Sequence, residues 1–376
     1  MTFKRVSIVA LTLVLALGLT VQTADAKVSM GVDFAQQFDG TESDAPGASS
    51  SFGFSTGKVN IDIYGDVAPG VEAFVETEGP FASDGEVHLR QGYVTLSNLF
   101  QPVDVKLGQF EVNYGENVHR RSTNADVQDN PFIGNSLDDV VAVQPGAQFS
   151  GEAAPVQWSL GITNGTAGGN FSDGRGWALI PKVKGEFAPN FTAALSYYTV
   201  DHESSTFSGS RGDNLFAQGS PSVVYQAGPL SGLDSAAGTR FVGATNPFAN
   251  SVSAYNLDLG YEAATGTKIK AWYGAFSVDN LSSMNAYDVT SYALEASHPF
   301  TPQSYGAIRY NVASNETSGV SGNTNSSRIQ VALGHNLNEN TQMKLEYVTQ
   351  TNEANAPAGT DGTDASGIIA EGSVTF

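Results

Sequence analysis

Three things are missing or scarce in this sequence, and each of them excludes a class of protein. There is no cysteine, which excludes a disulfide framework and thiolate metal sites. Only 18 basic residues stand against 38 acidic ones, for a formal net charge of −20, whereas a nucleic-acid-binding chain needs a basic surface. After residue 26 no apolar run exceeds four residues, which is too short for a membrane-spanning helix.

The long apolar stretch of the chain lies at its beginning. Two basic residues at 4–5 precede a mainly apolar run at 8–19, and Ala-Asp-Ala at 24–26 has the small residues of a cleavage site. This order is typical of a secretory signal peptide. We therefore expect residues 1–26 to be removed and an exported chain to begin near Lys27, with a formal net charge of −21.

Apolar and polar side chains alternate through most of the remaining chain. The pattern is clear in VQWSLGIT at 156–163, YNLDLGYE at 255–262, KIKAWYGA at 268–275 and MKLEYV at 343–348. A period of two residues is typical of a β-strand with one apolar and one polar face. No segment shows a helical stripe with caps, so the sequence predicts an all-β protein.

The connections between the strands distinguish a membrane barrel from a soluble sandwich. Seven short turns alternate with eight long polar stretches and join sixteen strands. Most of these strands have about 9–11 residues, enough to span the hydrocarbon when tilted. Short turns on one side and long loops on the other are typical of outer-membrane barrels. We predict a 16-stranded antiparallel transmembrane β-barrel formed by residues 27–376, with short periplasmic turns and long extracellular loops. The short turns are 66–70, 98–102, 151–155, 188–190, 263–266, 299–303 and 336–340, and the long stretches are 39–51, 79–86, 111–139, 164–176, 201–250, 279–286, 315–325 and 352–366.

The end of the chain fits this prediction. EGSVTF at 371–376 continues an alternating pattern, so the chain ends within a strand. In lipid every backbone group must pair within the protein, so the sheet must close and the last strand must pair with the first. Phe376 would then lie in the aromatic girdle at the membrane interface. A terminal phenylalanine on such a strand also resembles the signal that the outer-membrane assembly machinery of bacteria recognises.

A barrel of sixteen strands is too wide to be filled by side chains and encloses water. On each strand the alternate positions with polar side chains, called here the polar parity, should face this lumen. These positions hold most of the basic residues. The predicted basic pore wall consists of Lys58, Arg90, Lys106, Lys182, Lys184, Lys268, Lys270, Arg309, Arg328 and Lys344, and the carboxylates predicted beside them are Asp62, Glu72, Glu76, Asp104, Asp258 and Glu346.

The third long loop, residues 111–139, is the candidate constriction. Acidic residues outnumber basic ones in it, and an acidic loop opposite basic residues sets up a transverse field that favours small polar solutes. This balance predicts a weak cation preference. The candidate constriction residues are Glu111, Glu116, His119, Arg120, Arg121, Asp126 and Asp129.

The segments VDVKLGQFEVNYGENVHRR (103–121) and NPFIGNSLDD (130–139) resemble the phosphate-selective porin O and P family. In that family a strand ending in Gly-Gln-Phe runs into an aromatic-Gly corner and an arginine-bearing loop. The likeness covers roughly residues 52–163. It implies a homotrimeric sixteen-stranded porin in the outer membrane of a Gram-negative-type bacterium, with the third loop folded inward. Arg120 and Arg121 approximately match the loop arginines, but the dense basic run of a phosphate channel is missing.

We therefore expect a water-filled channel for passive diffusion of ions and small hydrophilic solutes, with no cofactor, metal or catalysis. The partners expected are outer-membrane lipid, the solutes and further copies of the chain. One alternative is a solute-selective, phosphate-type anion channel. A barrel enzyme using Asp201-His202 and Asp138-Asp139 at the rim is another, and a surface adhesin using the loop at 201–250 is a third.

Overall fold

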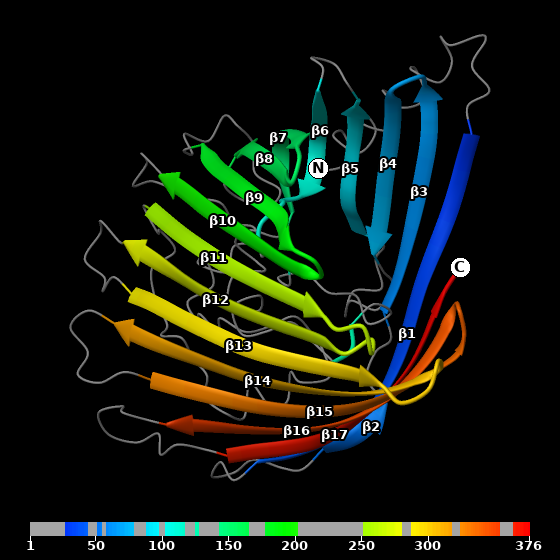
Figure 1. Cartoon of the computed structure of the whole chain (residues 1–376), viewed down its shortest axis with the longest axis vertical. Coiled ribbons are helices and arrows are strands. Elements are labelled where there is room, and N and C mark those ends of the chain that lie inside the picture. Colours follow the sequence, from blue (N-terminus) through cyan, green and yellow to red (C-terminus); the bar gives the residue numbers. More distant parts are fainter. Residues whose placement is uncertain are drawn as a thin grey trace, which may run out of the picture.

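The computed structural model describes residues 27–43, 51–54, 58–78, 88–97, 102–116, 125–127, 143–164, 177–201, 251–279, 287–317, 324–353 and 364–376. Every regular element in these ranges is a β-strand (Figure 1). No helix in this part of the chain is long and apolar enough to cross a membrane. The strands are β1 (Lys27–Ser43), β2 (Ser51–Phe54), β3 (Lys58–Ala68), β4 (Val71–Glu78), β5 (His88–Leu96), β6 (Val103–Glu111), β7 (Val143–Ala153), β8 (Val156–Thr163), β9 (Ala178–Ala188), β10 (Phe191–Asp201), β11 (Ser251–Glu262), β12 (Lys268–Asp279), β13 (Tyr287–Pro299), β14 (Ser304–Thr317), β15 (Thr324–Asn338), β16 (Thr341–Glu353) and β17 (Asp364–Thr375).

The sheet closes on itself, as the sequence predicts. From β3 onward each strand pairs antiparallel with the next, and β17 returns to pair with β1 from Asp33↔Thr375 to Ser43↔Ala365. Figure 1 shows the C-terminal end of β17 beside β1. Both β2 and β3 pair with β1, one after the other along its length. They are therefore two pieces of one strand, and the prediction of a closed 16-stranded antiparallel barrel is confirmed.

The predicted short turns join consecutive strands at one end of the barrel. The turns at 69–70, 154–155, 189–190, 263–267, 300–303 and 339–340 are described, while most of 98–102 lies outside the described residues. Gly70 has a φ of 75° and Asn190 a φ of 63°. Glycine and asparagine adopt this left-handed conformation with the least strain. The residue types at these two positions therefore suit the tight turns at 69–70 and 189–190.

Several strands are longer than the predicted span. β1 has 17 residues, β14 has 14 and β15 has 15. Hydropathy limits only the part of a strand that lies in lipid, because backbone pairing can continue into water beyond the membrane. β1 and β14 extend into the long connections that follow them, and β15 extends at both of its ends.

The two faces of the barrel wall differ in chemistry. Opposite each other on β10 and β11, Leu195 and Leu257 are exposed on the outside, whereas the next pair, Ser196 and Asn256, is buried on the inside. Leu333 on β15 is 57 % exposed in the same way. A soluble protein rarely leaves so many large apolar side chains in water, but an outer-membrane barrel presents such a band to lipid.

Candidate functional site

The first described piece of the third loop lies against the inner wall of the barrel. After β6 the chain turns at Gly115, whose φ is 66°. The Gly115 amide donates to Ser196 Oγ on β10 at 2.9 Å, and the Glu116 amide donates to Asp258 Oδ2 on β11 at 3.1 Å. Tyr114 is only 2 % exposed, and its burial raises the pKa of its phenol well above the ordinary value. The loop is thus bonded to strands distant from the one it leaves.

The second described piece reaches further across the lumen. Asp126 Oδ2 accepts a hydrogen bond of 2.9 Å from Ser297 Oγ on β13. The fully buried Val127 packs with Ala307 on β14 and Ala332 on β15. These strands lie across the barrel from β6 in the order of pairing. The two described pieces of the loop therefore contact inward-facing side chains on five strands: β10, β11, β13, β14 and β15.

Glu116 and two lysines of β9 form an ionic cluster at the loop. Glu116 Oε1 lies 2.6 Å from Lys182 Nζ, and its Oε2 lies 2.5 Å from Lys184 Nζ. Lys182 Nζ also donates to Asn113 Oδ1 at 2.8 Å and to the Gly115 carbonyl at 2.6 Å. Three acceptors thus use the three donors of Lys182. The Lys184 side chain remains 40 % exposed.

Two opposing effects set the pKa of Glu116. Burial raises it, because a buried carboxylate loses water. The charges and hydrogen bonds of Lys182 and Lys184 lower it, and together they prevail, so the pKa lies below the ordinary value of 4.5. The ion pairs therefore persist at neutral pH and are lost only when the pH falls through this depressed pKa.

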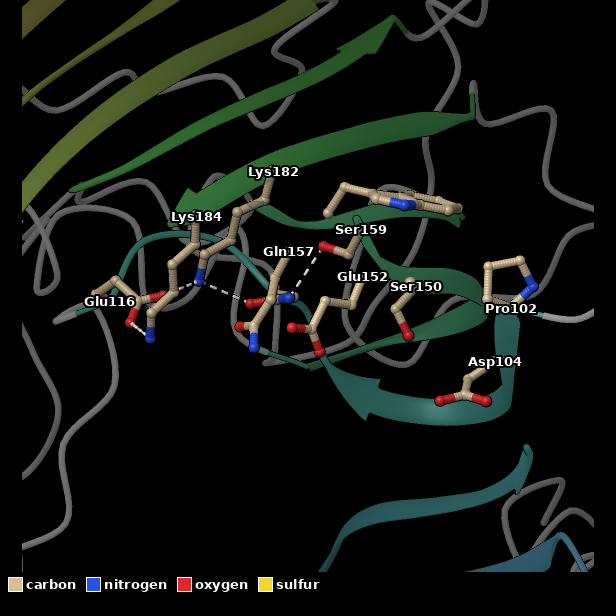
Figure 2. A pocket seen from close by; sticks show the side chains of 12 residues that line it. Pro102, Asp104, Glu116, Ser150, Glu152, Gln157, Ser159, Lys182 and Lys184 are labelled. Carbon is tan, nitrogen blue, oxygen red and sulfur yellow. Dashed lines mark hydrogen bonds and ion pairs between the residues drawn. The ribbon is translucent and has the colours of Figure 1, made fainter. Parts of the chain in front are cut away.

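Beside this cluster the inner wall of β6 to β9 is hollowed by a cavity of about 440 Å³ (Figure 2). Its wall carries charges of both signs. In Figure 2, Glu116, Lys182 and Lys184 gather at one end and Asp104 lies at the other, with Gln157, Ser159, Glu152 and Ser150 between them. The remaining lining residues are Pro102, Asn113, Gly151 and Trp158.

Other predicted wall residues are paired with neighbouring acids. Arg90 lies 2.9 Å from Glu76 and 3.6 Å from Glu111. On the far wall, Glu295 lies 3.5 Å from Lys270 and 3.6 Å from Arg309, and Lys344 lies 3.4 Å from Glu371, all as N to O distances. These four basic groups are thus paired with carboxylates on an adjacent strand.

The remaining predicted residues have different surroundings. Lys106 Nζ lies 4.4 Å from the centre of the Tyr93 ring, and the buried Arg328 donates to Gln350 at 2.8 Å. Lys268 is exposed at the short-turn end of β12. The side chain of Lys58 and all of His119, Arg120, Arg121 and Asp129 lie outside the described residues. In the part of the chain that is described, no group of His, Asp and Glu side chains could hold a metal ion.

Sequence reasoning missed Glu295 and Glu371 as acids of the inner wall. Both are almost fully buried, and both lie on the polar parity of their strands. In YALEAS at 292–297 the outward Tyr292 and Leu294 alternate with the inward Ala293 and Glu295. The parity was thus a sufficient signal. The buried, inward-facing Tyr198 was also missed, although it shares the parity of the inward Ser196.

Comparisons with known proteins agree with this architecture. Among solved structures, OmpT of Vibrio cholerae, an outer membrane protein, is similar with a TM-score of 0.62 at 11 % identity, covering 95 % of this chain and 99 % of that one. An anion-selective porin from Comamonas acidovorans has a TM-score of 0.61 at 13 % identity, covering 94 % and 100 %. The outer membrane channel DcaP of Acinetobacter baumannii has 0.59 at 12 %, covering 94 % and 99 %. At such identities the likeness shows the fold.

The family is shown by sequence. A comparison with curated proteins finds no significant match. A family model described as Gram-negative porin, however, matches residues 10–355, so the resemblance to outer-membrane porins expected from residues 52–163 is confirmed. Since this model spans most of the chain and the structure is a closed barrel with a polar inner wall, the protein belongs to the Gram-negative porin family.

Proposed function

We propose that this outer-membrane protein lets ions and small hydrophilic solutes diffuse passively through a water-filled lumen, without covalent chemistry, and that residues 111–139 narrow that lumen. Family membership supports the channel. The observation that carries the constriction is the set of hydrogen bonds between the third loop and the inward-facing side chains of Ser196, Asp258 and Ser297 on three strands. A loop held in this way reduces the open cross-section of the barrel.

The pairing of charges supports weak selectivity. Each described ionic cluster joins basic groups to at least one carboxylate, as Glu116 does with Lys182 and Lys184. With 38 acidic residues against 18 basic ones in the chain, we infer a weak cation preference. The alternative is an anion channel of the phosphate type. It depends on Arg120 and Arg121, and the fold similarity to an anion-selective porin favours it.

Purified protein in planar lipid bilayers tests the channel directly. We expect stepwise conductance and, in a salt gradient, a small reversal potential of the sign that cations produce. Because a trimer form of the Vibrio cholerae OmpT is among the similar structures, we also infer a homotrimer, whose conductance should close in groups of three steps.

The same recordings separate the alternatives. A large anion potential that disappears in the double variant Arg120→Ala with Arg121→Ala favours the anion channel. A barrel that inserts without conducting contradicts the porin proposal and favours a rim enzyme or an adhesin. We further infer that residues 1–26, which lie outside the described residues, are a signal peptide. Mass spectrometry of the exported protein should then give a chain beginning at Lys27.

Glu116→Gln should loosen the loop at neutral pH. The substitution keeps the shape of the side chain but removes both ion pairs with Lys182 and Lys184. We expect additional fluctuations in the open-channel current at pH 7. Wild type should show them only in acid, below pH 4.5, because the pKa of Glu116 is depressed.

The control for this prediction is Glu339→Gln, which makes the same change at an exposed position in the turn between β15 and β16. This variant should record like wild type at pH 7. Equal noise in Glu116→Gln and wild type across the whole pH range would show that the ion pairs do not restrain the loop.

A further inference from the structure

The inner wall around the cavity orders its charges in rows across four strands. In one row the register pairs Asp104 on β6 with Ser150 on β7, then Ser159 on β8 and Lys182 on β9. In the next row Glu152 on β7 pairs with Gln157 on β8, which pairs with Lys184 on β9. Each row runs from a carboxylate through neutral hydrogen-bonding groups to an ammonium group. The cavity is therefore dipolar along one direction (Figure 2).

The two ends of the cavity differ in net charge. Among the residues that line the cavity, Lys182 and Lys184 share one carboxylate, Glu116, so the lining at that end has two ammonium groups to one carboxylate. Because Lys182 has three acceptors around it, Lys184 is the lysine that presents donors to the cavity. On the side away from the lysines, the exposed Glu152 lies on β7 in the second row, and Asp104 lies on β6 in the first. A solute with a carboxylate at one end and an ammonium at the other matches this arrangement.

From this arrangement, and on the basis that the protein is a channel, we propose that the cavity is a binding subsite for short zwitterionic peptides, with the solute carboxylate at Lys184 and its ammonium at Glu152. Two strand spacings of about 4.8 Å put the Glu152 and Lys184 backbones roughly 10 Å apart, and both residues line the cavity. A dipeptide has about 7 Å of extended chain and suits that gap. A free α-amino acid, with both charges on one carbon, is too short.

The middle and size of the cavity support the same class of solute. Gln157 and Ser159 lie between the charged ends, and an amide and a hydroxyl can donate to and accept from a peptide bond. A volume of about 440 Å³ is within the usual range of small-molecule sites, roughly 300–1,000 Å³. The open side toward the lumen allows the weak, rapidly reversible binding that conduction requires.

Block of ion current by glycylglycine tests the subsite. In bilayers bathed in about 0.1 M KCl, where the screening length is still about 10 Å, glycylglycine should reduce the current of wild type in a saturable way. Lys184→Gln and Glu152→Gln should each raise the concentration for half block about tenfold, since each loses one charge-assisted hydrogen bond. N-acetylglycylglycine, which lacks the ammonium, should respond to Lys184→Gln alone.

The controls make the same charge changes outside the cavity, in Lys27→Gln and Glu339→Gln, two exposed positions near the short-turn end. Both should leave the half-block concentration unchanged. Block that does not saturate, or that is equal in all variants while every variant conducts, overturns the subsite and leaves the channel intact. A wild type that never conducts overturns the channel, and the subsite with it.

Discussion

Replacing residues 112–142 by a short glycine-serine linker should raise single-channel conductance several-fold. The change is sterically simple, because Glu111 at the end of β6 is paired with Val143 at the start of β7, and adjacent antiparallel strands can be joined by about two to five residues. It removes the loop hydrogen bonds to Ser196, Asp258 and Ser297. The inner wall between β10 and β15 then faces water, and the lumen widens.

The matched control shortens another long connection. Replacing residues 280–286 by the same linker joins β12 to β13, which pair at Val278↔Tyr287, and should leave conductance unchanged. Retained resistance of both variants to heat in detergent would show that the barrel still closes. If the variant without residues 112–142 conducts like wild type, the third loop is not the constriction, whatever its contacts with the wall.

The architecture of this protein could be predicted because lipid outside the barrel and water inside it require apolar and polar side chains to alternate along each strand. Leu195 faces outward to the lipid side and Ser196 faces inward, so the parity of each strand could be read without knowing its neighbours. Closure follows from the same physics, since an open edge in lipid is excluded. The strand count followed from the alternation of short and long connections. Side-chain alternation, closure of the sheet and the lengths of the connections do not depend on particular tertiary contacts.

The candidate site could be predicted only in part, because its contacts are not local. The parity of β9 placed Lys182 and Lys184 on the wall, but nothing in the sequence indicated that Glu116 would bind both. The hydrogen bond from Ser297 to Asp126 spans 171 positions. Of the loop carboxylates that are described, Glu111 and Glu116 pair directly with basic groups of the wall, whereas Asp126 bonds to Ser297. Charge composition alone cannot distinguish these two arrangements.

Phe376→Asp should reduce the amount of assembled barrel in the outer membrane several-fold. The Phe376 side chain is 68 % exposed on the outer face, at the end of the seam that closes the barrel. Its backbone N–H donates to the Val32 carbonyl at 3.0 Å, and its carbonyl accepts from the Val32 amide at 2.6 Å. The substitution leaves both bonds available. Any large loss must therefore come from the side chain.

The expected size of each effect distinguishes loss of recognition by the assembly machinery from loss of barrel stability at this position. A charge at the membrane interface costs a barrel only about 0–1 kcal/mol, and the rest of the β1–β17 seam is untouched. Refolding of Phe376→Asp in detergent should therefore match wild type, while the yield exported to the outer membrane falls. Phe300→Asp makes the same change at a side chain that is 62 % exposed near another short turn, and should assemble almost normally in cells. If both variants lose the same yield, or if Phe376→Asp also fails to refold in vitro, the terminal residue acts through stability and not as an assembly signal.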